Sequence, residues 1–341
     1  MRLLRKLPID GFVLSILATV ALASVFPVAG AAATILDGMV KAAIALLFFL
    51  YGTRLSPAEA MAGARHWRLH LTVLAVTFVV FPLIGLALRV LTPHVLSSAL
   101  YTGVLFACLV PSTVQSSIAF TSVARGNVPA AIVSASLSNL LGVVLTPLLV
   151  VALMTTTGGV HVSAESFGEI ILQLLLPFLA GQVCRPLVAG LLGRHPLLTK
   201  TVDRGSVLLV VYSAFSAGMA EHIWSSVSVG SIAVVMAVCA GVLGVVLVLS
   251  RWAAKALGFG RDDGIVIQFC GSKKSLAAGL PMAAVLFAGA PVGLIILPLM
   301  IFHQIQLLVC SMLAAHHGRV AAERAGTPSD DPTLDFVVRS P

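Results

Sequence analysis

Long apolar segments alternate with short polar stretches along almost the whole chain. Each apolar segment runs for about 20 residues or more, which is the length of a membrane-spanning helix rather than of a barrel strand. In hydrocarbon every backbone amide must bond within the structure, so we predict that each segment is a helix. The ten predicted helices cover residues 10–29, 34–52, 70–92, 98–124, 128–154, 166–192, 204–223, 229–252, 263–288 and 291–315.

The composition supports the same class of protein. Hydrophobic residues make up 59% of the 341 residues and charged residues 10%, whereas a soluble domain carries roughly 25% charged residues. A soluble fold of this length could not bury so much apolar surface, and a disordered chain would be polar. The net charge is +8, but the basic residues form no patch interleaved with aromatic residues, which disfavours a nucleic-acid partner. We therefore predict an all-α polytopic protein of the lipid bilayer.

The basic residues predict the orientation of the chain in the membrane. Cytoplasmic loops are enriched in Lys and Arg, and 17 of the 21 basic residues fall on one side of a ten-helix arrangement. We therefore expect both termini in the cytoplasm and the protein in the plasma membrane, with the bacterial inner membrane favoured. Residues 316–341 are polar and contain three prolines, so they are predicted to form a disordered cytoplasmic tail.

Two of the predicted helices are interrupted near their middle. The fourth contains the sequence VPSTVQSS at residues 110–117, where Pro111 removes a backbone donor. The ninth contains FCGSKKS at residues 269–275, and a lysine at mid-bilayer depth costs roughly 2.5 to 3.5 kcal/mol on insertion scales. Either motif alone is equally compatible with a structural irregularity, because Pro, Gly, Ser and Thr are common in membrane helices.

The matching positions of the two interruptions favour a functional interpretation. Each lies in the fourth helix of a set of five, and paired interruptions in two halves are typical of inverted-repeat transporters. We predict one five-helix repeat over residues 1–157 and a second, inverted repeat over residues 158–315, with the two broken helices crossing. The starts of the second half-helices would then offer free amide groups to an anion, and the unwound carbonyl groups could bind a cation.

Several motifs resemble those of the bile acid:sodium symporter family, solute carrier family 10. They are the Pro-x-x-x-x-Ser-Ser break at residues 111–117, Ala-Arg-Gly-Asn at 124–127 and the Thr146-Pro147 step. The run FCGSKKSLAAGLP at residues 269–281 resembles a divergent, SBF-like branch that includes the seventh vertebrate member. The resemblance covers the chain up to about residue 315.

The resemblance implies a fold, an activity and a coupling ion. Helices one, two, six and seven would form a panel, and helices three to five and eight to ten would form a core that contains the crossing. Members typically carry organic anions together with two sodium ions, which are bound by oxygen atoms of helices four, five and nine. The chain departs from this pattern, because Cys270 replaces a sodium-binding Glu and Lys274 replaces a neighbouring Gln. The family therefore implies sodium coupling, while the local chemistry argues against its usual form.

The candidate site consists of polar residues at the two breaks and on helices five and ten. Ser116 and Ser117 are the candidate sodium ligands, no further metal ligand and no cofactor is expected, and sodium itself stays doubtful. We expect Lys274 to bond carbonyl groups of the broken helices in place of sodium, and Lys273 to face the cavity and an anionic substrate. The substrate- or ion-binding candidates are Ser112, Thr113, Gln115, Ser116, Ser117, Ser134, Ser138, Asn139, Cys270, Gly271, Ser272, Lys273, Lys274, Ser275, His303 and Gln304.

Three functions remain to be separated. The favoured one is a secondary transporter that moves an organic anion by alternating access. An enzyme is disfavoured, because the predicted spans contain no mid-bilayer carboxylate and no Ser/His/Asp grouping. The alternative is a membrane protein that regulates ion homeostasis without transport, since the resemblance extends to a vertebrate member linked to calcium regulation.

Overall fold

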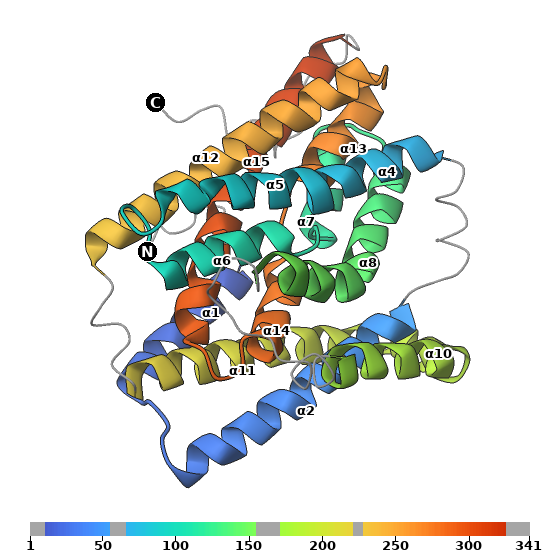
Figure 1. The fold of residues 1–341 in the computed structure, drawn as a ribbon. Helices are drawn as coiled ribbons and strands as arrows, with labels where there is room; N and C mark the ends of the chain where they lie inside the picture. The colour runs from blue at the N-terminus through green and yellow to red at the C-terminus, as the bar shows by residue number, and fades with distance from the viewer. Residues whose placement is uncertain (1–10, 55–65, 155–170, 221–227, 325–341) are drawn as a thin grey trace, which may run out of the picture.

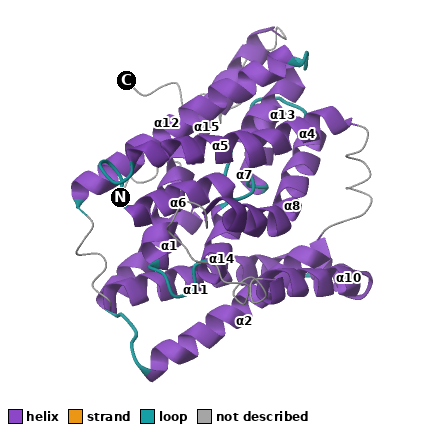
Figure 2. Cartoon of the chain, in the orientation of Figure 1, coloured by secondary structure: helices purple, strands orange, loops and turns teal. Residues whose placement is uncertain are grey.

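The computed structural model describes residues 11–54, 66–154, 171–220 and 228–324 (Figure 1). Within these ranges every regular element is a helix (Figure 2). The elements are α1 Gly11–Val25, α2 Ala31–Arg54, α4 Trp67–Ala75, η3 Val76–Val80, α5 Phe81–Ala87, η4 Leu88–Leu91, α6 Ser98–Leu109, α7 Gln115–Val123, α8 Val128–Met154, η5 Ile171–Leu175, α10 Leu176–Arg194, α11 Pro196–Ala220, α12 Val229–Ala256, α13 Arg261–Ser272, α14 Leu276–Leu286 and α15 Val292–Arg324.

Each apolar segment of the sequence coincides with one or more of these helices. In the part of the chain that the structure describes, six helical stretches are long and apolar enough to cross a membrane, as expected of a polytopic membrane protein. The segments predicted at 98–124 and 263–288 are each divided into two half-helices, α6 with α7 and α13 with α14. The polar interruptions in the sequence therefore correspond to real breaks in the helices.

The last helix extends beyond its predicted end. α15 continues to Arg324, so residues 316–324 are helical and the prediction of a disordered tail beginning at residue 316 is wrong for them. Alanine and arginine favour a helix here, and the His317 ring contacts Oε1 of Gln268 at 3.1 Å. The rest of the predicted tail, residues 325–341, lies outside the described residues.

Four helices pack together as a group that we call the panel, namely α1, α2, α10 and α11. Within the panel α2 packs along α10 and α11, and α11 packs along α1. Gly52 of α2 and Gly181 of α10 allow this close approach, because a Cβ atom at Gly52 would overlap the Phe178 carbonyl and one at Gly181 would overlap the Phe49 carbonyl. Small residues at such contacts let two membrane helices pack backbone to backbone.

The remaining helices surround the two breaks. α6 packs against α15 and α5, while α13 packs against α12, α4, α7 and α8. Figure 1 shows α2, α10 and α11 in the lower part of the view, α4, α5 and α12 in the upper part, and α6, α7 and α14 between them. The breaks therefore lie inside the molecule, between the panel and the group formed by α4, α5 and α12.

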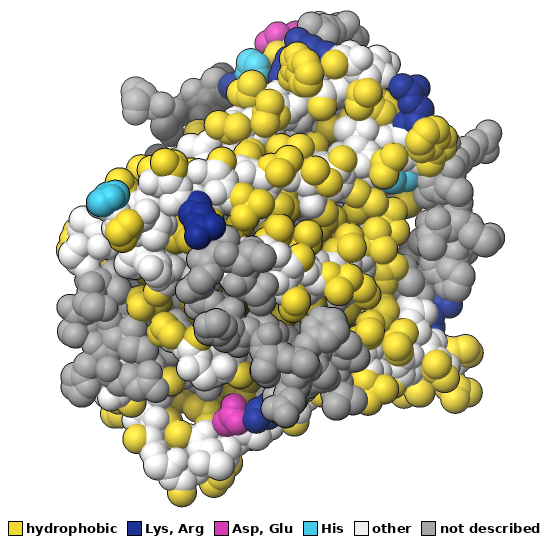
Figure 3. Space-filling view, in the orientation of Figure 1, with side chains coloured by type: hydrophobic (Ala, Val, Ile, Leu, Met, Phe, Trp, Pro, Cys, Tyr) yellow, Lys and Arg dark blue, Asp and Glu magenta, His cyan; other side chains and the backbone are white. Residues whose placement is uncertain are grey.

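The outer surface of the molecule is largely apolar. Figure 3 shows hydrophobic side chains spread over the visible face with few charged ones among them. Large apolar side chains such as Leu187 and Val229, each 84% exposed, have no protein neighbours that cover them. Such a surface is expected where the surrounding solvent is lipid rather than water.

Candidate functional site

The first break lies between α6 and α7. α6 ends at Leu109 and the backbone is extended at Val110, whose ψ is 155°. Pro111 has no N–H group, and the Ser112 N–H donates to Ser138 Oγ at 3.1 Å instead of continuing the helix. The Leu109 carbonyl accepts a bond from Thr146 Oγ1 at 2.9 Å. The break thus releases carbonyl groups of the last turn of α6, which need partners from elsewhere in the protein.

The second break lies between α13 and α14 and is joined directly to the first. The backbone is extended at Lys273, with φ −96° and ψ 154°. The Ser275 N–H donates to the Pro111 carbonyl at 2.8 Å, and the Ser275 side chain caps α14 by accepting from the Ala278 N–H at 3.2 Å. The prediction that the two breaks lie close together is therefore confirmed, and we call the place where they meet the crossing.

Lys274 lies at this junction and its ammonium group is completely enclosed. Nζ donates to the carbonyl oxygens of Thr77 at 3.0 Å, Cys108 at 2.8 Å and Val110 at 2.8 Å. An ammonium group has three N–H donors, so all three are used. The Phe81 ring lies 4.1 Å from Nζ, and the residue is 0% exposed. The expected bonds between Lys274 and the broken helix are present, at the end of α6 and just beyond it.

Gln306 of α15 holds the backbone of Lys274. Its Oε1 accepts from the Lys274 N–H at 2.8 Å, and its Nε2 donates to the Lys274 carbonyl at 2.9 Å. The His303 ring contacts Gln306 Nε2 at 2.9 Å. Gln304, which the sequence analysis singled out, is half-buried and lines neither of the two cavities described below. In the sequence, Gln306 could have been chosen over Gln304 as a site residue, because residues three apart lie on the same face of a helix and Gln306 is three residues from His303.

Lys273 points away from its neighbour and away from the cavities. Its side chain is 0% exposed, and Nζ lies 3.4 Å from the centroid of the Phe120 ring and 5.9 Å from that of Phe269. Nζ has no hydrogen-bond partner among the described residues. The prediction that Lys273 faces the cavity is therefore wrong. The reason is geometric, because successive side chains of an extended segment point to opposite sides.

The hydroxyl groups proposed as sodium ligands bond to the protein itself. Thr113 Oγ1 contacts Ser116 Oγ at 2.7 Å and Ser117 Oγ at 3.2 Å. Ser134 Oγ contacts Nδ1 of the buried His70 at 2.7 Å, a partner that sequence reasoning missed. The candidate oxygen atoms thus have hydrogen-bond partners within the protein.

The candidate positions 270–275, at the end of α13 and the second break, add no anionic oxygen. Cys270 is buried with its thiol 3.8 Å from the Ala131 carbonyl, and Gly271 lies against the Val76 side chain. Ser272 is also completely buried. Among the described residues no group of three or more His, Cys, Asp or Glu side chains could hold a metal ion. The residues at the crossing therefore do not fit the sodium pair that the resemblance implies, because no carboxylate replaces the missing Glu and the Lys274 ammonium already binds the carbonyl groups freed by the first break.

A cavity of about 480 Å³ lies between the panel and the crossing. Thr113, Gln115 and Ser116 at the start of α7 line it, as do Ser275 and Ala277 at the start of α14. From the other elements come Asn139 of α8 and His303 of α15. The candidate residues at the surface of this cavity are therefore those at the beginnings of the two half-helices, together with Asn139 and His303.

The panel contributes charged side chains to the same cavity. Arg54, Lys200, Asp203 and Arg204 all line it, which gives three basic groups and one carboxylate. Arg54 and Asp203 form a bidentate pair with N–O distances of 2.8 and 3.1 Å, and Arg204 stacks on the Phe12 ring at 5.2 Å. Two helix N-termini and an excess of basic side chains favour a negatively charged occupant.

A second cavity, of about 370 Å³, lies at the opposite ends of the same panel helices. Asp37, Val40, Lys41 and Ile44 of α2 line this cavity, whereas Tyr51 and Arg54 of α2 line the first. Between these two stretches of α2 lies Phe48, which is 0% exposed and belongs to the same core of buried apolar residues as Val207 of α11 and Leu280 of α14. Buried apolar residues therefore occupy the parts of α2, α11 and α14 that lie between the residues lining the two cavities.

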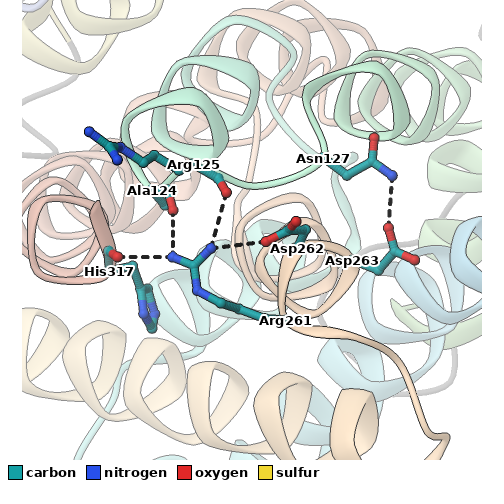
Figure 4. Close-up of polar contacts among 7 residues, drawn as sticks. All are labelled: Ala124, Arg125, Asn127, Arg261, Asp262, Asp263 and His317. Carbon is teal, nitrogen blue, oxygen red and sulfur yellow. Dashed lines mark hydrogen bonds and ion pairs between the residues drawn. The ribbon is translucent and has the colours of Figure 1, made fainter. Parts of the chain in front are cut away.

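A polar cluster joins the end of α7 to the start of α13, at the ends of these half-helices that lie away from the breaks. Figure 4 shows the Arg261 guanidinium at its centre, donating to the carbonyl oxygens of Ala124 at 2.9 Å, Arg125 at 3.1 Å and His317 at 2.9 Å. Asn127 Nδ2 also donates to Asp263 Oδ1 at 2.8 Å. The cluster ties the turn after α7 to the start of α13 and to α15, so it holds the two broken helices in register.

Comparison with known proteins places this architecture in a family. The model of the SBF-like CPA transporter family matches residues 10–319. The chain is 49% identical to "Uncharacterized protein PA2026" of Pseudomonas aeruginosa, over 96% of this chain and 98% of that protein. It is 46% identical to "Putative symporter YfeH" of Escherichia coli, over 94% and 95%. It is also 29% identical to "Sodium/bile acid cotransporter 7" of Danio rerio, over 80% and 81%.

The match to the family model spans nearly the whole chain, including both helix breaks and the polar cluster around Arg261. The relatives bear the names of transport proteins where a function is named, and none of those names is that of an enzyme. The chain is an integral membrane protein that belongs to the SBF-like CPA transporter family.

Proposed function

We propose that the protein is a secondary transporter that carries a small organic anion across the bacterial inner membrane by alternating access. The observation that carries the proposal is the cavity of about 480 Å³ in which the starts of α7 and α14 meet the basic side chains of the panel. Binding sites for small ligands commonly have volumes of about 300 to 1,000 Å³. The cavity is thus large enough for a compact organic anion.

The chemistry of the cavity favours negative charge over positive charge. The N–H groups at the start of a helix carry a partial positive charge, and here two helices begin at one wall. Arg204 and Lys200 face them from the panel, while the carboxylate of Asp203 is paired with Arg54. A carboxylate or sulfate group between these walls would gain hydrogen bonds from one side and ion pairs from the other.

The second cavity supports the alternating-access part of the proposal. The two cavities lie toward opposite ends of α2 and α11, and the buried residues Phe48, Val207 and Leu280 lie between their linings along α2, α11 and α14. Movement of the panel against the remaining helices would close one cavity and open the other, as in transporters built from repeats. We propose that the chain spans the membrane ten times as two inverted repeats. By the positive-inside rule, both termini and the first cavity then face the cytoplasm.

A ligand-binding screen tests the proposed substrate class. The purified protein is titrated with a sulfated steroid, a bile acid and a dicarboxylate, and each is compared with its uncharged counterpart by thermal unfolding. We expect saturable stabilisation by at least one anion and none by its uncharged counterpart. Arg204→Gln should weaken binding about 10-fold, because a charge-assisted hydrogen bond is lost.

Arg194→Gln is the matched control for this substitution. Arg194 is an exposed basic residue on the same predicted side of the membrane, but it does not line the cavity. Equal weakening by the two substitutions would show a general effect of charge and contradict the proposed site. A folded protein that neither binds nor carries any anion would instead favour the regulatory alternative.

A further inference from the structure

The three carbonyl groups around Lys274 form a cation site that the backbone itself creates. Each of them has lost the donor that a regular helix would supply. In the π-helical turn η3 the Phe81 N–H bonds to the Val76 carbonyl five residues earlier, so the next residue, Pro82, would be the donor for Thr77. Pro82 has no N–H group, which leaves the Thr77 carbonyl free.

The break after α6 frees the other two carbonyls. The regular donor for the Cys108 carbonyl would be the Ser112 N–H, which bonds to Ser138 Oγ instead. The Val110 carbonyl lies in the extended segment beyond the end of α6. Both lie at the C-terminal end of a half-helix, where the partial charge is negative. The three oxygens converge on one point in a part of the protein where no side chain is exposed.

Two further features suit this point to a monovalent cation. The Phe81 ring, with its centroid 4.1 Å from Nζ, presents the electron-rich face that attracts a cation. The oxygens are neutral carbonyls, and the hydrogen bonds and ion pairs of the described residues place no carboxylate against Nζ. A single positive charge therefore satisfies the site, whereas a divalent ion would lack the anionic ligands it prefers.

We infer that Lys274 is a built-in cation, whose ammonium group occupies this three-carbonyl site and makes the crossing independent of a bound metal ion. Because the cation is covalently attached, its occupancy does not depend on the ion concentration on either side of the membrane. The bonds from the Lys274 ammonium join η3 to the end of α6, and the bonds from Gln306 fix the Lys274 backbone to α15. The inference concerns the crossing that the proposed function uses, but it does not depend on the proposed substrate.

Chemical rescue of Lys274→Ala tests the inference. The substitution removes three carbons and the nitrogen, which is the size of propylammonium. We expect the midpoint of thermal unfolding to fall by about 5 to 10 °C, because bonds to a charged donor are lost in a buried site. Propylammonium chloride should then raise the midpoint of this variant saturably, whereas tetramethylammonium chloride, which has no N–H donor, should not.

Lys273→Ala is the matched control. Its side chain is equally buried, but its Nζ has no hydrogen-bond partner among the described residues. Propylammonium should therefore restore Lys274→Ala and leave Lys273→Ala unchanged. Rescue of both variants, or of neither while both are folded, would overturn the inference, because the three carbonyls would then have no special affinity for a cation.

A titration of the unaltered protein gives an answer even if the variants do not fold. Sodium chloride is compared with choline chloride at equal ionic strength, and the unfolding midpoint is recorded. An ion that binds the folded state raises its stability by RT ln(1 + [L]/Kd). We expect no sodium-specific rise, since Lys274 already occupies the site. A saturable sodium-specific rise would overturn the inference, whatever the protein transports.

Discussion

Replacement of Gln306 by leucine should destabilise the crossing, and the structure sets the magnitude. Gln306 makes two bonds to the backbone of Lys274, at 2.8 and 2.9 Å, and is 0% exposed. Leucine fills a similar volume without a donor or acceptor, so the Lys274 N–H and carbonyl lose their partner. Side-chain bonds in a membrane protein average about 0.6 kcal/mol each, whereas a buried unpaired group can cost about 1 to 3 kcal/mol.

Two bonds at the lower value give a loss of about 1 kcal/mol. Two unpaired groups at the higher value give about 6 kcal/mol, less about 2 kcal/mol gained by burying leucine. The expected loss is therefore about 1 to 4 kcal/mol, which lowers the unfolding midpoint by about 3 to 10 °C. The loss should appear without any change in the net charge of the protein.

Thermal unfolding followed by a thiol-reactive dye measures this loss. All five cysteines are free, and Cys108, Cys239, Cys270 and Cys310 are buried, so they react only as the fold opens. Gln304→Leu is the control, because Gln304 lies two residues away on the same helix and lines neither cavity. Its effect should stay within about 0.5 kcal/mol. Equal midpoints for the two variants would refute the role assigned to Gln306.

Two further substitutions test the contacts that position the site. Gly181→Ala should separate α2 from α10 and destabilise the panel by about 1 to 3 kcal/mol, because its methyl group would overlap the Phe49 carbonyl. Gly190→Ala, where nothing lies within 4 Å, should be neutral, and equal thermal midpoints would contradict the packing argument. Arg261→Gln should lower the midpoint by several degrees, because it removes bonds to three backbone carbonyls. Arg125→Gln should have little effect, because the side chain of Arg125 points away from this cluster in Figure 4, and the reverse order would be inconsistent with the account.

The hydrophobic pattern predicted the helices and the breaks because the bilayer restricts what a buried backbone can do. A segment of about 20 apolar residues in hydrocarbon has to be helical. A proline followed by hydroxyl and amide side chains interrupts it, as at Pro111. The same reasoning predicted the environment of Lys274, since a lysine at that depth needs acceptors and a helix break releases carbonyl groups.

Features that depend on packing between distant segments could not be predicted in this way. Lys273 and Lys274 are chemically identical, and only the extended backbone between α13 and α14 decides which one reaches α6. The third acceptor, the Thr77 carbonyl, depends on a π-helical turn in a segment that looks uniformly apolar. The contact between His70 and Ser134 joins helices 64 residues apart in the chain, and nothing in either local sequence indicates it.

Uptake into proteoliposomes tests the central claim most directly, namely that the protein carries an organic anion through a crossing that needs no bound sodium. The anion that gives the largest thermal stabilisation is supplied in labelled form, outside liposomes that contain the unaltered protein or Arg204→Gln. The account predicts saturable uptake by the unaltered protein, equal in sodium and in choline buffer, and weaker uptake by Arg204→Gln at low substrate concentration. Uptake no greater than that of protein-free liposomes, or uptake that requires sodium, would contradict it.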